Sequence, residues 1–455
     1  MTGASFSNPI IAAGIAGLRA LYADRAVTPV EAVDAYLSRI GGLDGGLGAF
    51  VHVDAAGARA AAHASSERWR KGRILSPIDG APIAVKANIA VAGLPWHGGV
   101  GAYRERLAEA DAECVSRLRA AGAVILGLTN MHEGAFGATT DNPWFGRTHN
   151  PWRHGVTAGG SSGGSGAAVA AGLCAGALGT DTLGSVRIPA SFTGTYGHKP
   201  TQGLISLEGV MAMSWTLDHV GVHGRSAEDC AQLLAGAMSA DVDLAEEVTR
   251  PADREALRLA PLAVLDLDGV AGVSPEVRAA LEAVVAAGLA AGLDIEPVSL
   301  DFDFLRAIGD GVLVAAVESL VEHAEALRVR PEGFSKGYRA ALALGERASA
   351  PDLARGYRDL ALAAEAARER LTPYAGLLMP TTPGLPEPFE TAADAGVALL
   401  TPLANVLGLP ATAFPVGAHA GLPLSVQALA WDDDTALGLA QLLGAPFEAP
   451  ECFRG

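Results

Sequence analysis

Apolar runs typical of buried strands alternate with helix-type patterns along the chain. Residues 82–91, PIAVKANIAV, and 122–130, GAVILGLTN, are short and nearly continuous apolar runs, and a helix is expected between them at 111–121. A strand, a helix and a strand in this order predict parallel pairing of the two strands, with helices on the faces of the sheet.

The second half of the chain continues this pattern. Helices are predicted over 275–291, which a Ser-Pro-Glu sequence opens, and over the Ala- and Arg-rich residues 352–371. Further strands are predicted at 262–270, 293–301, 376–384, 410–417 and 423–430. No internal repeat or low-complexity linker divides the chain, so we expect one large α/β domain over residues 1–455.

Two regions are predicted to add helices to this domain. Residues 1–70 form an N-terminal helical segment, in which Thr-Pro-Val-Glu at 28–31 has the sequence of a capping box with proline at the first helical position. That helix is expected to run to Ile40 and to end at the two glycines that follow. Residues 240–350 carry no clear motif and are predicted to be a helical excursion from the sheet.

The composition narrows the classes of partner. Half of the residues are hydrophobic, which is enough for a large core, and 50 acidic residues outnumber 33 basic ones for a net charge of −17. Nucleic-acid binding is not expected, because neutralising phosphates needs clustered Lys and Arg. The N-terminal region has no basic start of a secretory signal, and Arg19 interrupts its apolar run before it could span a membrane. We therefore expect a cytoplasmic protein with no membrane partner.

The cysteines are expected to be buried small side chains rather than disulfide partners or metal ligands, because they are few, widely spaced and without a Cys-x-x-Cys pair. They are Cys114, Cys174, Cys230 and Cys452.

A loop of glycines and serines, TAGGSSGGSG at residues 157–166, suggests chemistry. A phosphate-binding loop would end in Gly-Lys-Ser/Thr, but no lysine follows before Lys199, so that function is rejected. Residues 159–163 match the Gly-x-Ser-x-Gly nucleophile elbow, which needs a strand before it and a helix after it. A helix is plausible over 166–178, but residues 141–160 contain prolines and glycines and predict no strand. The elbow is therefore disfavoured.

A third interpretation connects this loop with two other segments. Lys86 lies inside the first apolar run, where burial would lower its pKa and let it accept a proton. Residues 179–190, GTDTLGSVRIPA, form a second turn of small residues that carries Ser185. A serine that relays a proton between the lysine and a second serine would make a nucleophile without histidine.

Longer stretches of the chain resemble the amidase signature family of serine amidohydrolases. The resemblance is carried by GGSSGGSGAAVAAG, GTDTLGSVRIPASFTGTYGHKPTQG, VKANI, NMHEGAFGATTDNPWFGRTHNPW, LLMPTTPG, NVLGLPATAFPVG and LPLSVQALA. It spans residues 25–440 and is most specific at 159–203. It implies a single α/β/α domain with a central mixed β-sheet flanked by helices. No metal or cofactor is expected.

The resemblance also implies a Ser–Ser–Lys catalytic triad. Lys86 corresponds to the base, Ser161 to the bridging serine that follows a cis peptide bond, and Ser185 to the nucleophile that forms an acyl-enzyme. The family's oxyanion hole corresponds to the backbone amides of Thr182, Leu183, Gly184 and Ser185.

Neighbouring residues are given supporting roles. Ala135, together with Ser161, lies where family members contact substrate. Asp181 and Arg187 flank the nucleophile turn, and a structural ion pair or turn bond is favoured there over a role in orienting substrate.

Other polar residues are expected to be structural. Ser162 and Ser165 are interpreted as first-turn helix residues that satisfy backbone amides. The pair His132–Glu133 does not begin a zinc-binding HExxH motif, because residue 136 is phenylalanine. Other histidines could serve a Ser-His-Asp mechanism, but no spacing distinguishes one among His149, His154, His198, His219 and His223.

Two residues depart from the family pattern. Leu183 stands where the family commonly has glycine, and it would be strained if position 183 needed a positive φ. We expect it to reshape the acyl pocket rather than to abolish activity. Ala87 replaces the usual aspartate, which removes one carboxylate that would keep Lys86 protonated.

These features predict an enzyme that uses water to hydrolyse the C–N bond of a small linear amide or urea-like compound through an acyl-enzyme on Ser185. The chain is similar to bacterial family members that act on carboxybiuret, mandelamide or indoleacetamide, and residues 240–350 are expected to shape the substrate pocket. Homodimer formation is left open.

Two alternatives remain. A glutamine-hydrolysing subunit of a tRNA-dependent amidotransferase is disfavoured, because Thr201 is followed by Gln-Gly-Leu where that group usually has Tyr-Gly-Arg. A degenerate, non-catalytic homologue is suggested by Leu183.

Overall fold

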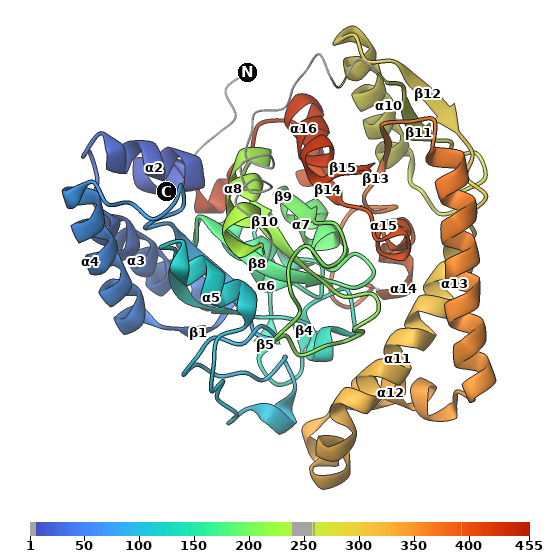
Figure 1. Ribbon diagram of the computed structural model, residues 1–455, viewed down its shortest axis with the longest axis horizontal. Helices are drawn as coiled ribbons and strands as arrows, with labels where there is room; N and C mark the ends of the chain where they lie inside the picture. The colour runs from blue at the N-terminus through green and yellow to red at the C-terminus, as the bar shows by residue number, and fades with distance from the viewer. Residues whose placement is uncertain (1–5, 239–256, 258–259, 393) are drawn as a thin grey trace.

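The computed structural model describes residues 6–238, 257, 260–392 and 394–455. A mixed sheet of 11 strands runs through the centre of the molecule (Figure 1). Its strands, in order across the sheet, are β1 (Phe50–Val53), β3 (Val124–Thr129), β2 (Pro82–Lys86), β8 (Gly176–Asp181), β10 (His219–Gly224), β9 (Tyr196–Lys199), β14 (Ala411–His419), β15 (Leu422–Ala430), β13 (Gly376–Pro380), β11 (Leu262–Leu265) and β12 (Ile295–Val298).

The sheet confirms the predicted strands and adds four that the sequence did not reveal. β2 and β3 pair in parallel, as expected, and the helix between them is α5 (Glu113–Ala120). β1, β8, β9 and β10 were missed. The helix predicted over 166–178 is wrong in its second half, because the chain forms α6 (Gly163–Ala170) and then enters β8. Alanine locally favours helix, but β8 is buried along its whole length between a parallel and an antiparallel neighbour, and this tertiary pairing overrides the local propensity.

Helices cover both faces of the sheet. On β8, a Cβ atom at Gly179 would contact Ser162 and Val186, which flank α6 and α7 (Arg187–Thr193), whereas one at Gly176 would contact Leu233 of α8 (Ala227–Ala237). Residues three apart on a strand point to opposite faces, so α6 and α7 lie on one face and α8 on the other. On the sheet's far half, α10 (Pro275–Ala290) and α16 (Asp433–Leu443) pack on the strands of the C-terminal hairpin.

The N-terminal helices form one side of the molecule, at the left of Figure 1. The described elements there are α1 (Pro9–Ala12), α2 (Gly14–Ala23), α3 (Pro29–Leu47) and α4 (Ala55–Lys71). The predicted capping box is present, since the Thr28 and Glu31 side chains and amides bond reciprocally. The predicted end of α3 is wrong: the helix continues to Leu47 and is capped by Gly48 with φ 69°. Each of the four glycines Gly41, Gly42, Gly45 and Gly46 costs about 1 kcal/mol in a helix, and burial of Leu47, which contributes roughly 1.5–3 kcal/mol, offsets part of that cost.

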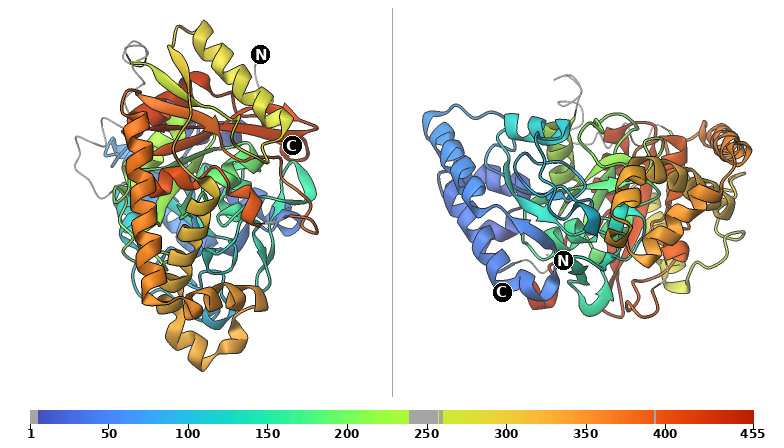
Figure 2. Two further views of the ribbon diagram at one scale, coloured as in Figure 1. Left: turned by 90° about the vertical axis from the view of Figure 1, so that its right-hand side faces the viewer. Right: turned by 90° about the horizontal axis from the view of Figure 1, so that it is seen from below.

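The opposite side is built by three long helices (Figures 1 and 2). They are α11 (Phe304–Val329), α12 (Lys336–Arg347) and α13 (Ala350–Leu371), and α11 packs against both others. Residues 239–256 and 258–259 of the predicted excursion lie outside the described residues. Within its described part, residues 262–298 contribute β11, α10 and β12 to the main body, so the excursion is confined to α11 and α12.

The segment 141–160 contains short strands, contrary to the prediction. β4 (Asp141–Asn142) pairs with β5 (Gly146–Arg147), and β6 (His149–Asn150) pairs with β7 (Arg153–Thr157). These two small ladders are separate from the main sheet. The strand that a nucleophile elbow requires directly before its serine is therefore not supplied by the main sheet.

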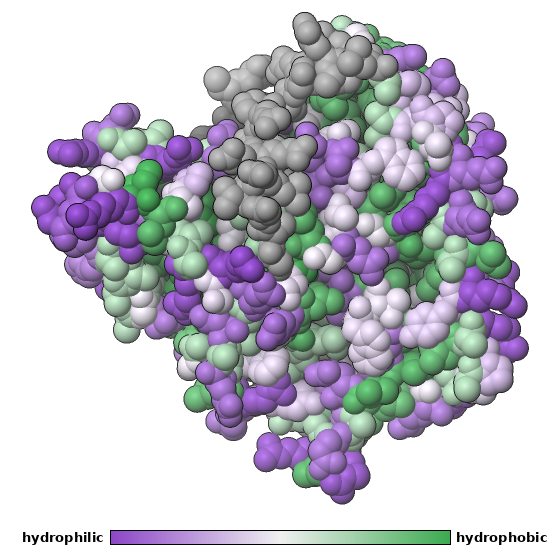
Figure 3. Space-filling model, viewed as in Figure 1, coloured by the Kyte–Doolittle hydropathy of each residue, from purple (hydrophilic) through white to green (hydrophobic). Residues whose placement is uncertain are grey.

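The cysteines agree in part with the expectation of buried small side chains. Three of the cysteines are buried and free, but Cys452 is free and exposed, so the prediction is wrong at that position. On the face shown in Figure 3, hydrophobic residues lie in small groups among polar ones. Of the helices in the described residues, none combines the length and hydrophobicity that crossing a membrane requires.

Candidate active site

Lys86 ends strand β2 with its side chain completely buried. Its Nζ lies 2.7 Å from Oγ of Ser161 and 2.7 Å from Oγ1 of Thr180. Burial lowers the pKa of Lys86 to about 7, against the opposing influence of the carboxylates of Asp218 and Asp181. Much of the lysine is therefore neutral near neutral pH and can accept a proton from the Ser161 hydroxyl.

Ser161 follows the cis peptide bond Gly160–Ser161, in the loop between β7 and α6. A Cβ atom at position 160 would lie 2.7 Å from the backbone carbonyl carbon of Ala138, so only glycine fits this close approach. The Ser161 carbonyl accepts a hydrogen bond from the amide of His132 at 3.1 Å. These backbone contacts hold the Ser161 hydroxyl against Lys86.

Ser185 lies in the turn from β8 to α7 and borders a cavity. The amide of Ser162 donates to the Ser185 carbonyl at 3.2 Å, which joins the two serine-bearing loops. Within the described part of the chain, the Ser185 hydroxyl has no hydrogen-bond partner. The fold thus places Lys86 against Ser161 and joins the loop of Ser161 to the turn of Ser185, with the Ser185 hydroxyl left free at the cavity.

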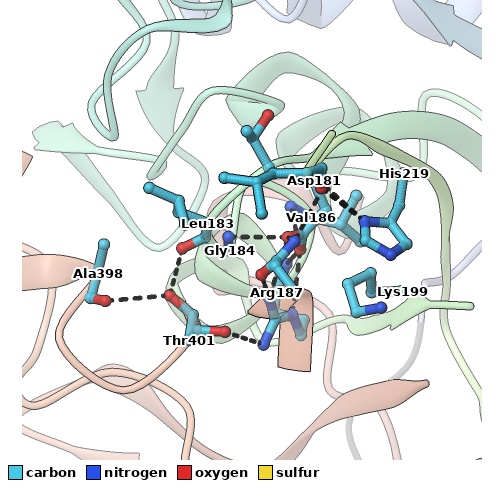
Figure 4. A network of polar contacts seen from close by, with 12 residues as sticks. Asp181, Leu183, Gly184, Val186, Arg187, Lys199, His219, Ala398 and Thr401 are labelled. Atoms are coloured by element: carbon cyan, nitrogen blue, oxygen red, sulfur yellow. Dashed lines mark hydrogen bonds and ion pairs between the residues drawn. The ribbon is translucent and has the colours of Figure 1, made fainter. Parts of the chain in front are cut away.

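A buried ion pair braces the turn between β8 and α7 (Figure 4). Arg187 Nη2 donates to Asp181 Oδ1 at 3.0 Å, and neither side chain is exposed. Asp181 also accepts from the amides of Gly184 and Val186, at 2.8 and 3.1 Å. Burial alone would raise the pKa of Asp181, but the charge and hydrogen bonds of Arg187 outweigh it and hold that pKa well below its usual range. The expected structural ion pair is present.

One of the four backbone amides assigned to the oxyanion hole is engaged elsewhere. The Gly184 amide donates to the Asp181 carboxylate, so in this structure it is not free to bind an oxyanion, contrary to the prediction. The amides of Thr182, Leu183 and Ser185 have no acceptor among the described residues, and all three residues border the cavity. The turn therefore leaves three free donors beside the Ser185 hydroxyl.

Leu183 is accommodated without backbone strain. The residues other than glycine with positive φ in the described chain are Arg25, Ala135, Thr140 and Ala420. Leu183 is not one of them, so the condition under which leucine would be strained is not met.

The cavity beside Ser185 has a volume of about 710 Å³ and a mainly apolar wall. Ala135, with φ 60°, belongs to this wall, as do Glu133 and the exposed Lys336. Glu133 is occupied in structural contacts, since its Oε1 accepts from the Trp144 indole at 2.8 Å and from a backbone amide. Helices α11 and α12 supply part of the apolar wall, which includes Phe136, Ile188, Met213, Ile308, Val312 and Ala341.

Sequence reasoning missed Asp218, a buried carboxylate beside the turn. It accepts a hydrogen bond from the Thr182 hydroxyl at 2.5 Å and from the amides of Met213 and Ser214 at 2.9 and 3.1 Å. Burial raises its pKa to about 6. Asp218 is the first of the charges that oppose deprotonation of Lys86, so a carboxylate acts on the lysine although Ala87 carries none. No local sequence signal marks it, because only the fold brings its segment to the turn.

Ser162 and Ser165 lie at the start of α6, as predicted, but their side chains do not bond the amides of that helix. The Ser162 hydroxyl donates to the Thr180 carbonyl at 3.1 Å and accepts from the Thr180 amide at 3.2 Å. The Ser165 hydroxyl donates to the Leu178 carbonyl at 2.9 Å and also bonds to the hydroxyl of Thr129. Both side chains therefore attach α6 to the sheet, because α6 is too deeply buried for its first turn to face water.

Within the described residues, no histidine is hydrogen-bonded to the Ser185 hydroxyl, although His132 borders the same cavity. His219 Nδ1 contacts the carbonyls of Asp181 and Leu217, and both ring nitrogens of His223 lack a partner within the described residues. Burial lowers the pKa of each histidine to about 3. No cluster of metal-ligating side chains occurs in the described part of the chain.

The chain is similar to known proteins along most of its length. A family model described as Amidase matches residues 31–437. The A subunit of glutamyl-tRNA(Gln) amidotransferase from Thermus thermophilus is 36% identical over 457 residues, covering 93% of this chain and 95% of that protein. Its counterpart of the same name from Anaeromyxobacter sp. (strain K) is 43% identical over 277 residues, and this match covers 60% of the chain but only 55% of that relative.

Among solved structures, the peptide amidase PAM in complex with the competitive inhibitor chymostatin has a TM-score of 0.84 at 26% identity. The match covers 96% of this chain and 99% of that one.

Proposed function

Because this chain belongs to the amidase signature family, we propose that it cleaves the carbon–nitrogen bond of an amide through an acyl-enzyme on Ser185. Ser161 relays the proton and Lys86 is the base. The observation that carries the proposal is the 2.7 Å contact between the Lys86 Nζ and the Ser161 hydroxyl, both of them buried. A lysine shielded from water and partly deprotonated near pH 7 can take a proton from this hydroxyl.

In the proposed first step, Ser185 Oγ attacks the amide carbonyl carbon. Its proton passes to Ser161, whose own proton passes to neutral Lys86. The free amides of Thr182, Leu183 and Ser185 stabilise the oxyanion, and one such donor typically contributes roughly 2.7–4 kcal/mol. When the C–N bond breaks, the proton returns along the relay to the leaving nitrogen, which departs as ammonia or an amine.

Water completes the proposed cycle. A water molecule attacks the acyl carbon while the same relay takes up its proton. The proton then returns to Ser185 Oγ as the ester bond breaks and a carboxylic acid is released. Atoms balance, since one amide and one water give one acid and one amine.

The cavity wall supports a small amide with an apolar body as substrate. Its side chains are mostly aliphatic or aromatic, and α11 and α12 provide a large share of them, so we propose that this part of the 240–350 region shapes the substrate pocket. The likeness to a peptide amidase supports hydrolysis rather than transfer. We further propose a single domain in a cytoplasmic protein, which the free cysteines support.

A second candidate is a glutamine-hydrolysing component that passes ammonia to a partner protein. The names of the curated relatives support it more strongly than they support the first candidate, because these relatives are components of an amidotransferase. Glutamine also carries an α-carboxylate, which the exposed Lys336 at the cavity could bind. Both candidates share the acyl-enzyme half of the mechanism and differ in substrate and in dependence on partners.

Ammonia release distinguishes these functions. The isolated protein would be offered aryl amides, aliphatic amides, biuret derivatives and glutamine, beside a Ser185→Ala control. Turnover of a small amide without any partner, lost in the control, supports the first candidate. Glutamine turnover alone, or only after adding partner proteins, supports the second. A chain that releases no ammonia and is not labelled at Ser185 by a fluorophosphonate is a non-catalytic homologue.

A further inference from the structure

The leucine at position 183 fits against a glycine on helix α11. A Cβ atom built on Gly311 would lie 3.1 Å from Cδ2 and 3.4 Å from Cδ1 of Leu183, which is tighter than ordinary side-chain contact. Gly311 belongs to the same helix stretch as Ile308 and Val312, which line the cavity. The leucine side chain therefore lies in the space that the missing side chain of Gly311 leaves open.

Leu183 cannot easily withdraw from this place. Its carbonyl accepts a hydrogen bond from the Thr401 hydroxyl at 2.5 Å, and the following amide, that of Gly184, donates to Asp181 at 2.8 Å (Figure 4). The peptide group after Leu183 is thus fixed on both sides. Because this backbone is held in place, the Leu183 side chain can only occupy space in the cavity or space next to α11.

Helix α11 is also held in position near Gly311. Glu318, two turns along, is buried and accepts hydrogen bonds from the hydroxyls of Ser214 and Thr216, both at 2.5 Å. The Tyr357 hydroxyl on α13 donates to the same carboxylate at 2.6 Å. These charge-assisted bonds tie α11 to the loop before β10 and to α13, so a larger side chain at position 311 is not relieved by a shift of the helix.

We propose that the Leu183–Gly311 contact determines specificity for substrates: Leu183 occupies the space next to Ser185 and admits only amides whose group beside the scissile carbonyl is compact. This inference rests on the proposed function. Leu183 borders the same cavity as Ser185, two residues along the same turn, so its side chain limits the reactive end of the cavity. Gly311 is the positioning partner, because it keeps the leucine from being pushed towards the nucleophile.

The test uses two fluorophosphonates that differ only in the bulk of the group on phosphorus, one methyl and one benzyl. The labelling rate of Ser185, located by mass spectrometry, is compared in the wild type, Leu183→Ala, Leu183→Val, Gly311→Val and the Leu183→Ala/Gly311→Val double variant. Thermal unfolding midpoints show that each variant is folded.

Leu183→Ala is expected to raise the benzyl-to-methyl rate ratio by about tenfold or more, and Leu183→Val by less, since removing one or more methylenes from a pocket changes selectivity about 10–200-fold. Gly311→Val should lower both rates, and the double variant should recover the methyl rate. A rate ratio that stays within twofold in both folded Leu183 variants overturns the inference. Absence of Ser185 labelling in the wild type instead refutes the proposed function, and the inference with it.

Discussion

The Lys86 ammonium nitrogen lies 2.7 Å from the Ser161 hydroxyl oxygen, and neither side chain reaches solvent. The other close partner of the nitrogen is a neutral hydroxyl, that of Thr180, also at 2.7 Å. Hydroxyls stabilise an ammonium less well than water or a carboxylate would. The neutral amine is therefore favoured over the charged form, and the pKa of Lys86 falls. The proposed reaction therefore depends on the protonation of Lys86.

Activity should rise with pH through about 7 and level off above it. The pKa of Lys86 is lowered to about 7, so the neutral base forms above that pH and is lost below it. His219 and His223, with pKa values of about 3, stay neutral throughout, whereas the buried Asp218 and Lys199, with pKa values of about 6 and 7, also titrate in this pH range. The measurement is kcat/KM for the best amide from pH 5 to 9. A profile that is flat between pH 6 and 8 contradicts a lysine base.

The same pKa shift has a consequence for stability. A lysine in the unfolded chain has a pKa near 10.5, so between about 7 and 10.5 the unfolded state binds more protons than the folded state. The free energy of unfolding therefore increases with pH in this window, because Lys86 must take up a proton when the chain unfolds and this uptake becomes less favourable as the pH rises. Lys86→Met should flatten the dependence of the urea midpoint on pH from 7.5 to 10, relative to the wild type. An unchanged slope would show that Lys86 is already charged in the folded protein.

Replacing Lys86 by methionine should lower kcat by at least about 100-fold, because a positioned general base typically contributes about 10²–10⁴ in rate. Lys71→Met is the matched control, since Lys71 is half exposed at the end of α4, outside the residues that border the cavity. The control should keep wild-type activity. Comparable activity in the two variants would remove Lys86 from the mechanism.

Asp218→Asn should move the acidic limb of the pH profile to lower pH. The Asp218 carboxylate raises the pKa of Lys86, and asparagine removes the charge but keeps an oxygen that can accept from the Thr182 hydroxyl. Asp34→Asn, on the exposed surface, serves as the control and should leave the limb in place. If the limb does not move in Asp218→Asn, Asp218 does not affect the pKa of Lys86 in the active enzyme, and its role is only to hold the turn in place.

Among the serines, only two should matter for chemistry. Ser185→Ala should abolish acyl-enzyme formation, and Ser161→Ala should slow it strongly. Ser162→Ala and Ser165→Ala should stay active and lose about 1–3 kcal/mol of stability each, because their hydroxyls bond buried backbone or hydroxyl groups. Rapid-quench detection of the acyl-enzyme and chemical denaturation measure the two effects. A catalytically dead Ser162→Ala with normal stability would argue for a different relay.

Breaking the buried ion pair should destabilise the fold. Arg187→Met leaves the Asp181 charge uncompensated in the interior, which typically costs about 3–5 kcal/mol. Arg59→Met removes an exposed pair with Asp34 and should cost no more than about 1 kcal/mol. Denaturant midpoints of the two variants test this contrast. Equal midpoints would mean that Asp181 finds other compensation, such as protonation.

The sequence alone determined the elements with strong local signals. The apolar runs at 82–91 and 122–130 predicted β2 and β3 in parallel register, and the capping box placed the start of α3 correctly. Lys86 inside an apolar run was enough to predict a buried lysine with a lowered pKa, because burial follows from hydrophobic neighbours. The family motif then distinguished Ser161 and Ser185 among many serines.

Tertiary structure decided what depends on residues distant in the chain. The Ala- and Gly-rich stretch after Ser165 could be helix or strand, and only its place between β2 and β10 made part of it β8. The Gly184 amide donates to the Asp181 carboxylate, and the Asp218 charge acts on Lys86. Both interactions exist because the fold brings their segments together. Whether leucine fits at position 183 was likewise settled by Gly311 on a helix far along the chain, since available space is a property of packing and not of local sequence.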